Sequence, residues 1–174
     1  MQDLRALLQT GGLLLADGAT GTMLQSLGLP AGAAPELWNL DRPAAVRSLH
    51  RAYVDAGSQI VLTNTFGGSR IRMAHAGAGD RVAELNRAAA RLAREEVGEE
   101  AYVAGDIGPT GQLMAPYGPL HYEEAVEAFA EQARALVEGG VDLLWVETMS
   151  DLNEARAAIA AARQATDRPV VCSL

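Results

Sequence analysis

Val141-Asp142-Leu143-Leu144-Trp145-Val146 is a short, almost continuous apolar run, which is typical of a strand buried on both faces of a parallel sheet. Four similar runs lie elsewhere in the chain. The five runs cover residues 13–16, 59–62, 101–104, 141–146 and 169–172. Between them, apolar residues recur every three or four positions, as they do along the buried stripe of an amphipathic helix. This alternation predicts an α/β fold of βα units with a parallel sheet.

The helices are predicted around four apolar stripes, which span residues 46–53, 82–92, 122–136 and 152–162. Asp80 precedes the second stripe, and Asp151-Leu152-Asn153-Glu154 has the pattern of a capping box before the fourth. Gly57 and Gly139-Gly140 stand where left-handed C-caps are needed, each shortly before a strand. The start and stop signals therefore agree with the helical periodicity.

Two architectures share this pattern, the open doubly wound sheet and the closed (β/α)8 barrel. Five strands are enough for the first and too few for the second. The chain stops at Leu174, at the end of its fifth predicted strand and with no helix to cover it, which indicates truncation. No compositional break divides residues 1–174, and the Gly/Pro-rich stretches at residues 28–35 and 108–119 are predicted as long βα loops. A single folding unit is therefore expected.

Composition argues against several classes of protein. Of the 174 residues, 49% are apolar, the formal net charge is −8, and all 14 basic side chains are Arg. Nucleic acid is not an expected partner, because no Lys/Arg cluster can displace counterions from phosphates. The absence of Lys excludes a lysine Schiff base. The apolar runs are far shorter than the roughly 20 residues that cross a bilayer, so no membrane partner is expected. With Cys172 as the single cysteine and no signal-peptide pattern at the N-terminus, a cytoplasmic protein is predicted.

Polar side chains stand at or just after the end of each predicted strand. They are Asp17, Asn64, Asp106, Glu147 and Ser173. In both architectures, ligands bind at the carboxyl ends of the parallel strands. Ser, Asn and Asp at such places also serve as helix caps or turn residues. Glu147 is a poor cap and a poor turn former, so it is predicted to be functional.

Asp17-Gly18-Ala19-Thr20-Gly21-Thr22 follows the first predicted strand. Its glycines allow a tight turn whose amide groups face an anion such as a carboxylate. The segment has neither the GxGxxG spacing nor the GK[ST] ending of a phosphate loop, which argues against a doubly wound nucleotide-binding domain. A tight βα turn capped by Asp and Thr is the alternative. The two glycines in Gly105-Asp106-Ile107-Gly108 imply close backbone approach, to a ligand or to a neighbouring loop.

His50, His75 and His121 share no spacing with another His, Cys or carboxylate that would make a metal site. Surface or capping roles are predicted for all three. Cys172, within Val-Val-Cys-Ser, is predicted to be a small core residue rather than a nucleophile, because no His is placed to activate it.

Five motifs together resemble the homocysteine S-methyltransferase family, which includes the homocysteine-binding module of cobalamin-dependent methionine synthase and the betaine–homocysteine methyltransferases. They are residues 15–22 (LADGATGT), 36–39 (ELWN), 63–67 (TNTFG), 105–111 (GDIGPTG) and 145–149 (WVETM). The resemblance runs from about Leu13 to Leu174. It implies a (β/α)8 TIM barrel, of which this chain supplies about the first five β/α units. Residues 1–174 are then the N-terminal portion of a single homocysteine-binding barrel.

The family transfers a methyl group to the thiol of homocysteine in a zinc-dependent reaction that gives methionine, and the resemblance implies the same reaction here. Three cysteines hold the zinc in members of the family. They belong to segments beyond Leu174, so no metal ligand is expected within this chain. Zinc lowers the pKa of the substrate thiol, which matters because a free thiol with a pKa of about 8.5 is only a few per cent ionised at pH 7. Methylcobalamin in further domains, betaine or S-methylmethionine would serve as the methyl donor.

The resemblance also implies roles for particular residues. Glu147 matches the residue that receives the homocysteine ammonium, and the Asp17 to Thr22 loop matches the segment that approaches the substrate, with its carboxylate as the expected partner. Asn64, Thr65 and Asp106 match pocket-lining positions. The expected substrate-binding residues are therefore Asp17, Gly18, Ala19, Thr20, Gly21, Thr22, Asn64, Thr65, Asp106 and Glu147.

The alternative hypothesis is a catalytically incomplete half-barrel. Such a fragment would bind the amino-acid part of the substrate, or self-associate as a homo-oligomer through its uncovered fifth strand and exposed core.

Overall fold

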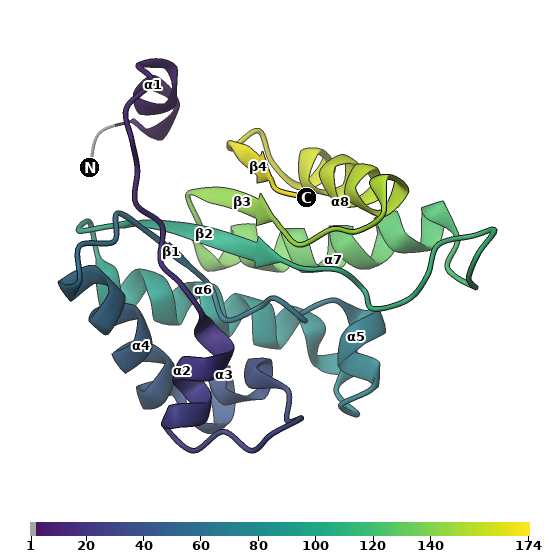
Figure 1. Cartoon of the computed structure of the whole chain (residues 1–174), viewed down its shortest axis with the longest axis horizontal. Helices are drawn as coiled ribbons and strands as arrows, with labels where there is room; N and C mark the ends of the chain where they lie inside the picture. The colour runs from purple at the N-terminus through teal and green to yellow at the C-terminus, as the bar shows by residue number, and fades with distance from the viewer. Residues whose placement is uncertain (1–2) are drawn as a thin grey trace.

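The computed structural model describes residues 3–174, which form a parallel sheet with helices α6, α7 and α8 packed along it (Figure 1). The strands are β1 (Ile60–Leu62), β2 (Tyr102–Ile107), β3 (Leu143–Val146) and β4 (Val170–Cys172). The α-helices are α1 (Leu4–Gln9), α2 (Thr20–Ser26), α3 (Trp38–Asp41), α4 (Pro43–Asp55), α5 (Arg70–Ala74), α6 (Val82–Val97), α7 (Tyr122–Gly139) and α8 (Leu152–Ala165). Two 3-10 turns, η1 (Pro35–Leu37) and η2 (Gly79–Arg81), precede α3 and α6.

The sheet has the order β1-β2-β3-β4, and every neighbouring pair is parallel. Alternate residues along a strand face opposite sides of the sheet. Val61 and Val103 belong to the main core with residues of α6, α7 and α8. Ile60 and Tyr102 belong to a smaller cluster with Leu4 of α1. The predicted βα units and parallel sheet are therefore confirmed, with the larger core between the sheet and the helices.

The run at residues 13–16 was expected to be a strand and forms only an isolated parallel bridge, between Ala16 and Ile60. Hydrogen bonds from Ile60 N to Leu15 O (3.1 Å) and from Asp17 N to Ile60 O (2.9 Å) hold the segment beside β1. On its other side it has no strand neighbour within residues 3–174, and Leu13 is 99% exposed. The ladder does not extend beyond this bridge. The described sheet accordingly has four strands rather than five.

Helix ends follow the predicted signals in part. The Asp151 side chain caps α8 by accepting a hydrogen bond from Asn153 N (2.7 Å). Gly140 ends α7 in the left-handed conformation, with φ +99°, and Gly57 has φ +100° just after α4. Asp80 was predicted to start α6 and does not cap it, because it lies inside η2 and Arg81 takes the N-cap position without a side-chain hydrogen bond.

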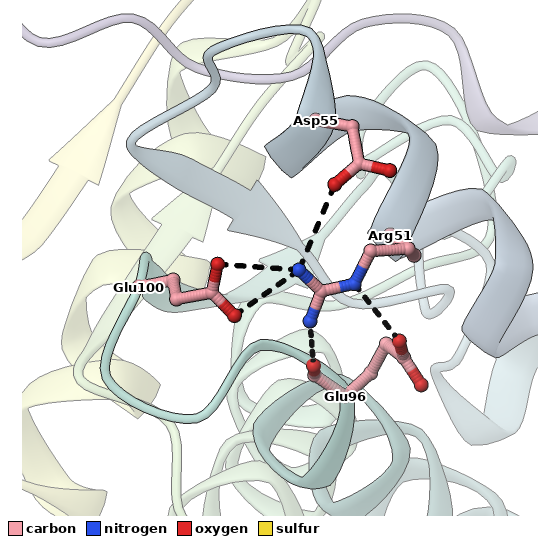
Figure 2. Close-up of polar contacts among 4 residues, drawn as sticks. All are labelled: Arg51, Asp55, Glu96 and Glu100. Carbon is pink, nitrogen blue, oxygen red and sulfur yellow. Dashed lines mark hydrogen bonds and ion pairs between the residues drawn. The ribbon is translucent and has the colours of Figure 1, made fainter.

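A cluster of charged residues joins α4 to the end of α6 (Figure 2). Arg51 Nε donates to Glu96 Oε1 (3.1 Å), and Arg51 Nη1 donates to Glu100 Oε1 (3.1 Å) and lies 3.7 Å from Asp55 Oδ1. Exposed ion pairs of this kind contribute little individually. The orientation of α4 follows from its buried face, which carries Val46, Leu49 and His50.

His50, next to Arg51, faces the other way. The expectation of a surface or capping role is wrong for this residue, because His50 is fully buried and neither ring nitrogen has a hydrogen-bond partner. The reason is helical geometry, since residue 50 lies one turn after Val46 and beside Leu49 on the buried stripe. Burial lowers the pKa of His50 to about 4, from 6.5.

His50 is expected to make the fold sensitive to acid. The unfolded chain takes up a proton near pH 6.5 and the folded chain only near pH 4, so stability falls as the pH drops through this window and by about 3 kcal/mol in all. Urea unfolding of the wild type and of His50→Leu at pH 7.5, 5.5 and 4.5 measures this loss. As the pH falls, the wild type should lose more unfolding free energy than His50→Leu does.

The matched control is His121→Leu, because His121 is exposed at the start of α7. The pH-dependent change in stability should be larger for His50→Leu than for this control. If the difference between His50→Leu and the wild type stays constant with pH, His50 does not stay neutral in the folded protein.

Cys172 was predicted to be a core residue and is instead exposed, because β4 lies at the edge of the described sheet. Within residues 3–174, no helix is both long enough and apolar enough to cross a membrane.

Candidate functional site

A cavity of about 840 Å³ opens at the carboxyl ends of the strands. Four carboxylate side chains line it: those of Asp17, Glu36, Asp106 and Glu147. The remaining lining residues are Gly18, Ala19, Thr20, Gly21, Gly32, Ala33, Ala34, Pro35, Leu62, Asn64, Phe66, Gly67, Arg72, Met73, His75, Ala76, Thr110 and Gly111. The expectation that polar strand ends gather at one place therefore agrees with the structure for residues 17, 64, 106 and 147.

Asp17 follows the bridge to β1 and is anchored at one oxygen. Its Oδ2 accepts a hydrogen bond from Leu62 N (2.9 Å). The pKa of Asp17 is raised to about 7, chiefly by burial; the Leu62 hydrogen bond opposes the shift, and the charge of Glu147 adds to it. Near neutral pH this carboxyl is therefore divided between its protonated and ionised forms.

Asp106 lies within β2 and is the most buried of the strand-end carboxylates, with 5% of its surface exposed. Its Oδ1 is buried without any hydrogen-bond partner. Burial holds the pKa of Asp106 well above its usual range, and the charges of Glu147 and Asp17 add to this effect. A buried carboxylate oxygen without a donor is costly, and a cation in the cavity would relieve that cost.

Glu147 follows β3 directly and is partly buried. Its backbone N donates to Ile107 O (3.1 Å), which ties the end of β3 to β2. Burial raises the pKa of its carboxyl, and a hydrogen bond with the Trp145 side chain opposes the rise. The next residue, Thr148, has φ +60°, an unusual conformation for a β-branched residue. Strain of this kind is characteristic of functional sites.

Glu36 is a site residue that strand-end reasoning missed. It comes from η1, and its Oε1 accepts a hydrogen bond from Gly67 N (2.6 Å) in the loop after β1. Burial raises the pKa of Glu36 as well, partly offset by its hydrogen bonds and by the charge of Arg72. Its place in the ELWN motif was the only sequence signal, because η1 follows no strand.

The side chains of Asn64 and Thr65 form hydrogen bonds that connect the segments around the cavity. Asn64 Nδ2 donates to Pro35 O (2.8 Å) and to Asn39 Oδ1 (3.0 Å), which fixes the ELWN segment to the end of β1. Thr65 Oγ1 donates to Asp106 O (2.8 Å). Neither Thr65 nor Thr22 is among the residues that line the cavity, whereas residues 17 to 21 are.

Three side chains from helices support the site and were not anticipated. Gln132 Nε2 donates to Thr65 O (2.8 Å) and Asp106 O (3.2 Å), so α7 holds the ends of two strands. Tyr53 OH donates to Ala19 O (3.1 Å). Glu154 was expected to complete the capping box of α8. Its Oε1 instead accepts hydrogen bonds from Thr110 N (2.8 Å) and Thr110 Oγ1 (2.6 Å), which fixes the loop after β2.

The sequence as a whole matches a known family. The model of the homocysteine S-methyltransferase family matches residues 14–174. The chain belongs to this family. The methionine synthase of Mycobacterium tuberculosis (strain ATCC 25618 / H37Rv) is 32% identical over 168 residues, an alignment that covers 90% of this chain and 14% of that protein.

Solved structures of the homocysteine methyltransferase MmuM from Escherichia coli are similar throughout. Its oxidised form matches with a TM-score of 0.80 and 27% identity, over 100% of this chain and 66% of that chain. Its metallated form matches with a TM-score of 0.79 and 27% identity, over 97% and 64% of the two chains. The chain therefore shares the fold of a homocysteine S-methyltransferase and spans less than two thirds of the relatives it matches. Closure of the barrel stays a prediction.

One of the solved structures of MmuM is a metallated form. Within residues 3–174, no group of three His, Cys, Asp or Glu side chains could hold a metal ion. Cys172, the single cysteine of the sequence, is exposed on β4, away from the cavity lining. The described residues of this family member therefore do not fit a zinc centre built from thiolates.

Proposed function

We propose that the cavity binds the amino-acid end of homocysteine, with the ammonium group held by Asp106, Asp17 and Glu147. The observation that carries this proposal is the buried, unpartnered Oδ1 of Asp106 beside two further carboxylates with raised pKa values. An ammonium group has three donors and no acceptor, so it matches the oxygens of three carboxylates in their ionised form. Charge-assisted hydrogen bonds of this type are about twice as strong as neutral ones.

The remaining wall of the cavity suits the rest of an amino acid. Residues 17 to 21 line it, and their backbone is proposed to approach the substrate carboxylate, while Asn64 and Asp106 line the pocket deeper in. Clamping both charged groups fixes the orientation of the substrate and leaves its thiol free to react.

The reaction proposed for the whole protein is methyl transfer to homocysteine, giving methionine. The sulfur lone pair forms a bond to the methyl carbon, the bond between methyl and donor breaks with its electrons on the donor, and the thiol proton is released. Family membership supports this reaction, and zinc, methylcobalamin and a cytoplasmic location stay predictions for the whole protein. What this chain contributes to that reaction is binding and orientation of homocysteine.

Glu147→Gln tests the proposal in the full-length protein. We expect the affinity for homocysteine, measured by isothermal titration calorimetry, to fall about tenfold, because one charge-assisted hydrogen bond to the ammonium is lost. Glu138→Gln is the matched control, because Glu138 pairs with Arg87 on the outer helices and does not line the cavity. Equal affinity of Glu147→Gln and wild type would contradict the assignment.

Self-association is the second candidate, and the exposed apolar residues at the edge of the sheet favour it. Leu13, Leu15 and Leu174 are all more than half exposed, and β4 has one unpaired edge within the described residues. Light scattering of the 174-residue chain tests this candidate. Larger species would support it, and a monomer at high concentration would contradict it.

A further inference from the structure

Arg72 of α5 lines the carboxylate-rich cavity and has no ion-pair partner there. It is the one guanidinium among the described residues of the lining, and none of the described residues forms an ion pair with it within 4.0 Å. Arg70, two residues earlier on the same helix, differs in this respect. It lies outside the lining and pairs with Glu127 (3.1 Å) and Glu131 (3.7 Å) of α7.

The Arg72 guanidinium lies against two glycines of the neighbouring loops, and its charge also acts on Glu36 across Gly67. Its Nε lies 3.0 Å from the point that a Cβ on Gly67 would occupy, and its Nη1 lies 3.4 Å from the corresponding point on Gly111. Its Cζ lies over the Phe66 ring, 5.6 Å from the centroid, within the range of cation–π contacts. Glycines in the loops after β1 and β2 therefore make room for this cation at the wall of the cavity.

We propose that Arg72 is a substrate-binding residue that receives the α-carboxylate of the amino acid, together with the backbone of residues 17 to 21, while the ammonium group lies against Asp106 and Glu147. This inference rests on the proposed function and deepens it. A guanidinium presents two parallel N–H donors that match the two oxygens of a carboxylate. In a cavity with four carboxylates and one guanidinium, a zwitterion meets an opposite charge at both ends. A carboxylate ligand without an ammonium group would meet net repulsion.

Three thiols with the same thiol end and different charged groups test the contribution of the carboxylate and of the ammonium group separately. They are homocysteine, 3-aminopropane-1-thiol, which lacks the carboxylate, and 4-sulfanylbutanoate, which lacks the ammonium group. Each is titrated calorimetrically into the wild type, Arg72→Met, Arg72→Lys and the control Arg70→Met of the full-length protein. Because 4-sulfanylbutanoate meets net repulsion in the cavity, it is expected to bind more weakly than homocysteine to every variant. Arg72→Met is expected to weaken homocysteine about tenfold or more and to leave 3-aminopropane-1-thiol unchanged. Arg72→Lys keeps the positive charge but lacks the two parallel N–H donors of the guanidinium, so it should lose less affinity for homocysteine than Arg72→Met does. Arg70→Met should lose none.

The outcomes distinguish this inference from the proposed function. If the wild type binds homocysteine and Arg72→Met binds it equally well, Arg72 is not its carboxylate partner, and the proposed function stands. If Arg72→Met weakens all three thiols alike, its role is structural and the inference is overturned. If the wild type does not bind homocysteine at all, the proposed function fails and this inference fails with it.

Discussion

Replacing Asp106 with Asn is expected to lower the affinity for homocysteine on the order of 100-fold, the largest effect of any single substitution in the cavity. Asp106 is the most buried strand-end carboxylate, and its Oδ1 has no partner in the protein. An ammonium group bound there would be shielded from water, so its attraction to the Asp106 carboxylate is strong. Removing that charge therefore costs most of this binding energy. Calorimetric titration of Asp106→Asn with homocysteine measures the effect.

The same substitution is expected to raise the stability of the unliganded protein. The pKa of Asp106 is raised in the folded chain, so the unfolded chain ionises first as the pH rises, and stability is lost between the unfolded and the folded pKa. Asn has no such penalty. Urea unfolding at pH 7 should therefore show Asp106→Asn more stable than the wild type, and the advantage should disappear in acid. Weaker binding together with lower stability would mean that Asn disrupts the fold, and would contradict the account of Asp106 as a carboxylate kept unpaired for a ligand.

Homocysteine affinity is expected to fall about tenfold for each pH unit below 7. The pKa of Asp17 is about 7 in the unliganded protein, and an ammonium ligand binds the ionised form. Binding therefore releases a proton near neutral pH, and protonation of Asp17 competes with the ligand as the pH falls. Titrations in buffers with different ionisation enthalpies count this proton directly.

Asp17→Asn is the matched variant for the pH dependence, because an amide oxygen can still accept the Leu62 N hydrogen bond. The variant should bind homocysteine more weakly at pH 8 and release fewer protons at pH 7 than the wild type does. If proton release is unchanged in Asp17→Asn, the group that titrates near pH 7 is not Asp17.

The polar residues at the strand ends could be predicted from sequence, because each strand is recognised from its local run of apolar residues. Once buried parallel strands are recognised, their carboxyl ends must meet, and this places Asp17, Asp106 and Glu147 at one cavity. The first run forms only the bridge between Ala16 and Ile60, because its apolar pattern indicates burial but not how many residues pair with the neighbouring strand. His50 could have been recognised, since it lies one turn from Val46 on the buried stripe.

Glu36 and Arg72 could not be predicted by the same reasoning. Neither follows a strand, and each reaches the cavity only because the loop after β1 folds back over η1, with Gly67 between the two side chains. Gln132 and Glu154 likewise lie on helices whose sequence pattern indicates only which face is buried. Their hydrogen bonds to Thr65, Asp106 and Thr110 depend on tertiary packing.

A crystal structure of the full-length protein with homocysteine tests the central claim most directly, because the claim concerns the partner of one buried oxygen. The account predicts the ammonium nitrogen about 2.7–3.2 Å from Asp106 Oδ1, with Glu147 or Asp17 as a second acceptor. Homocysteine bound with its thiol or carboxylate at this position, or with the Asp106 carboxylate still unpartnered, would contradict it.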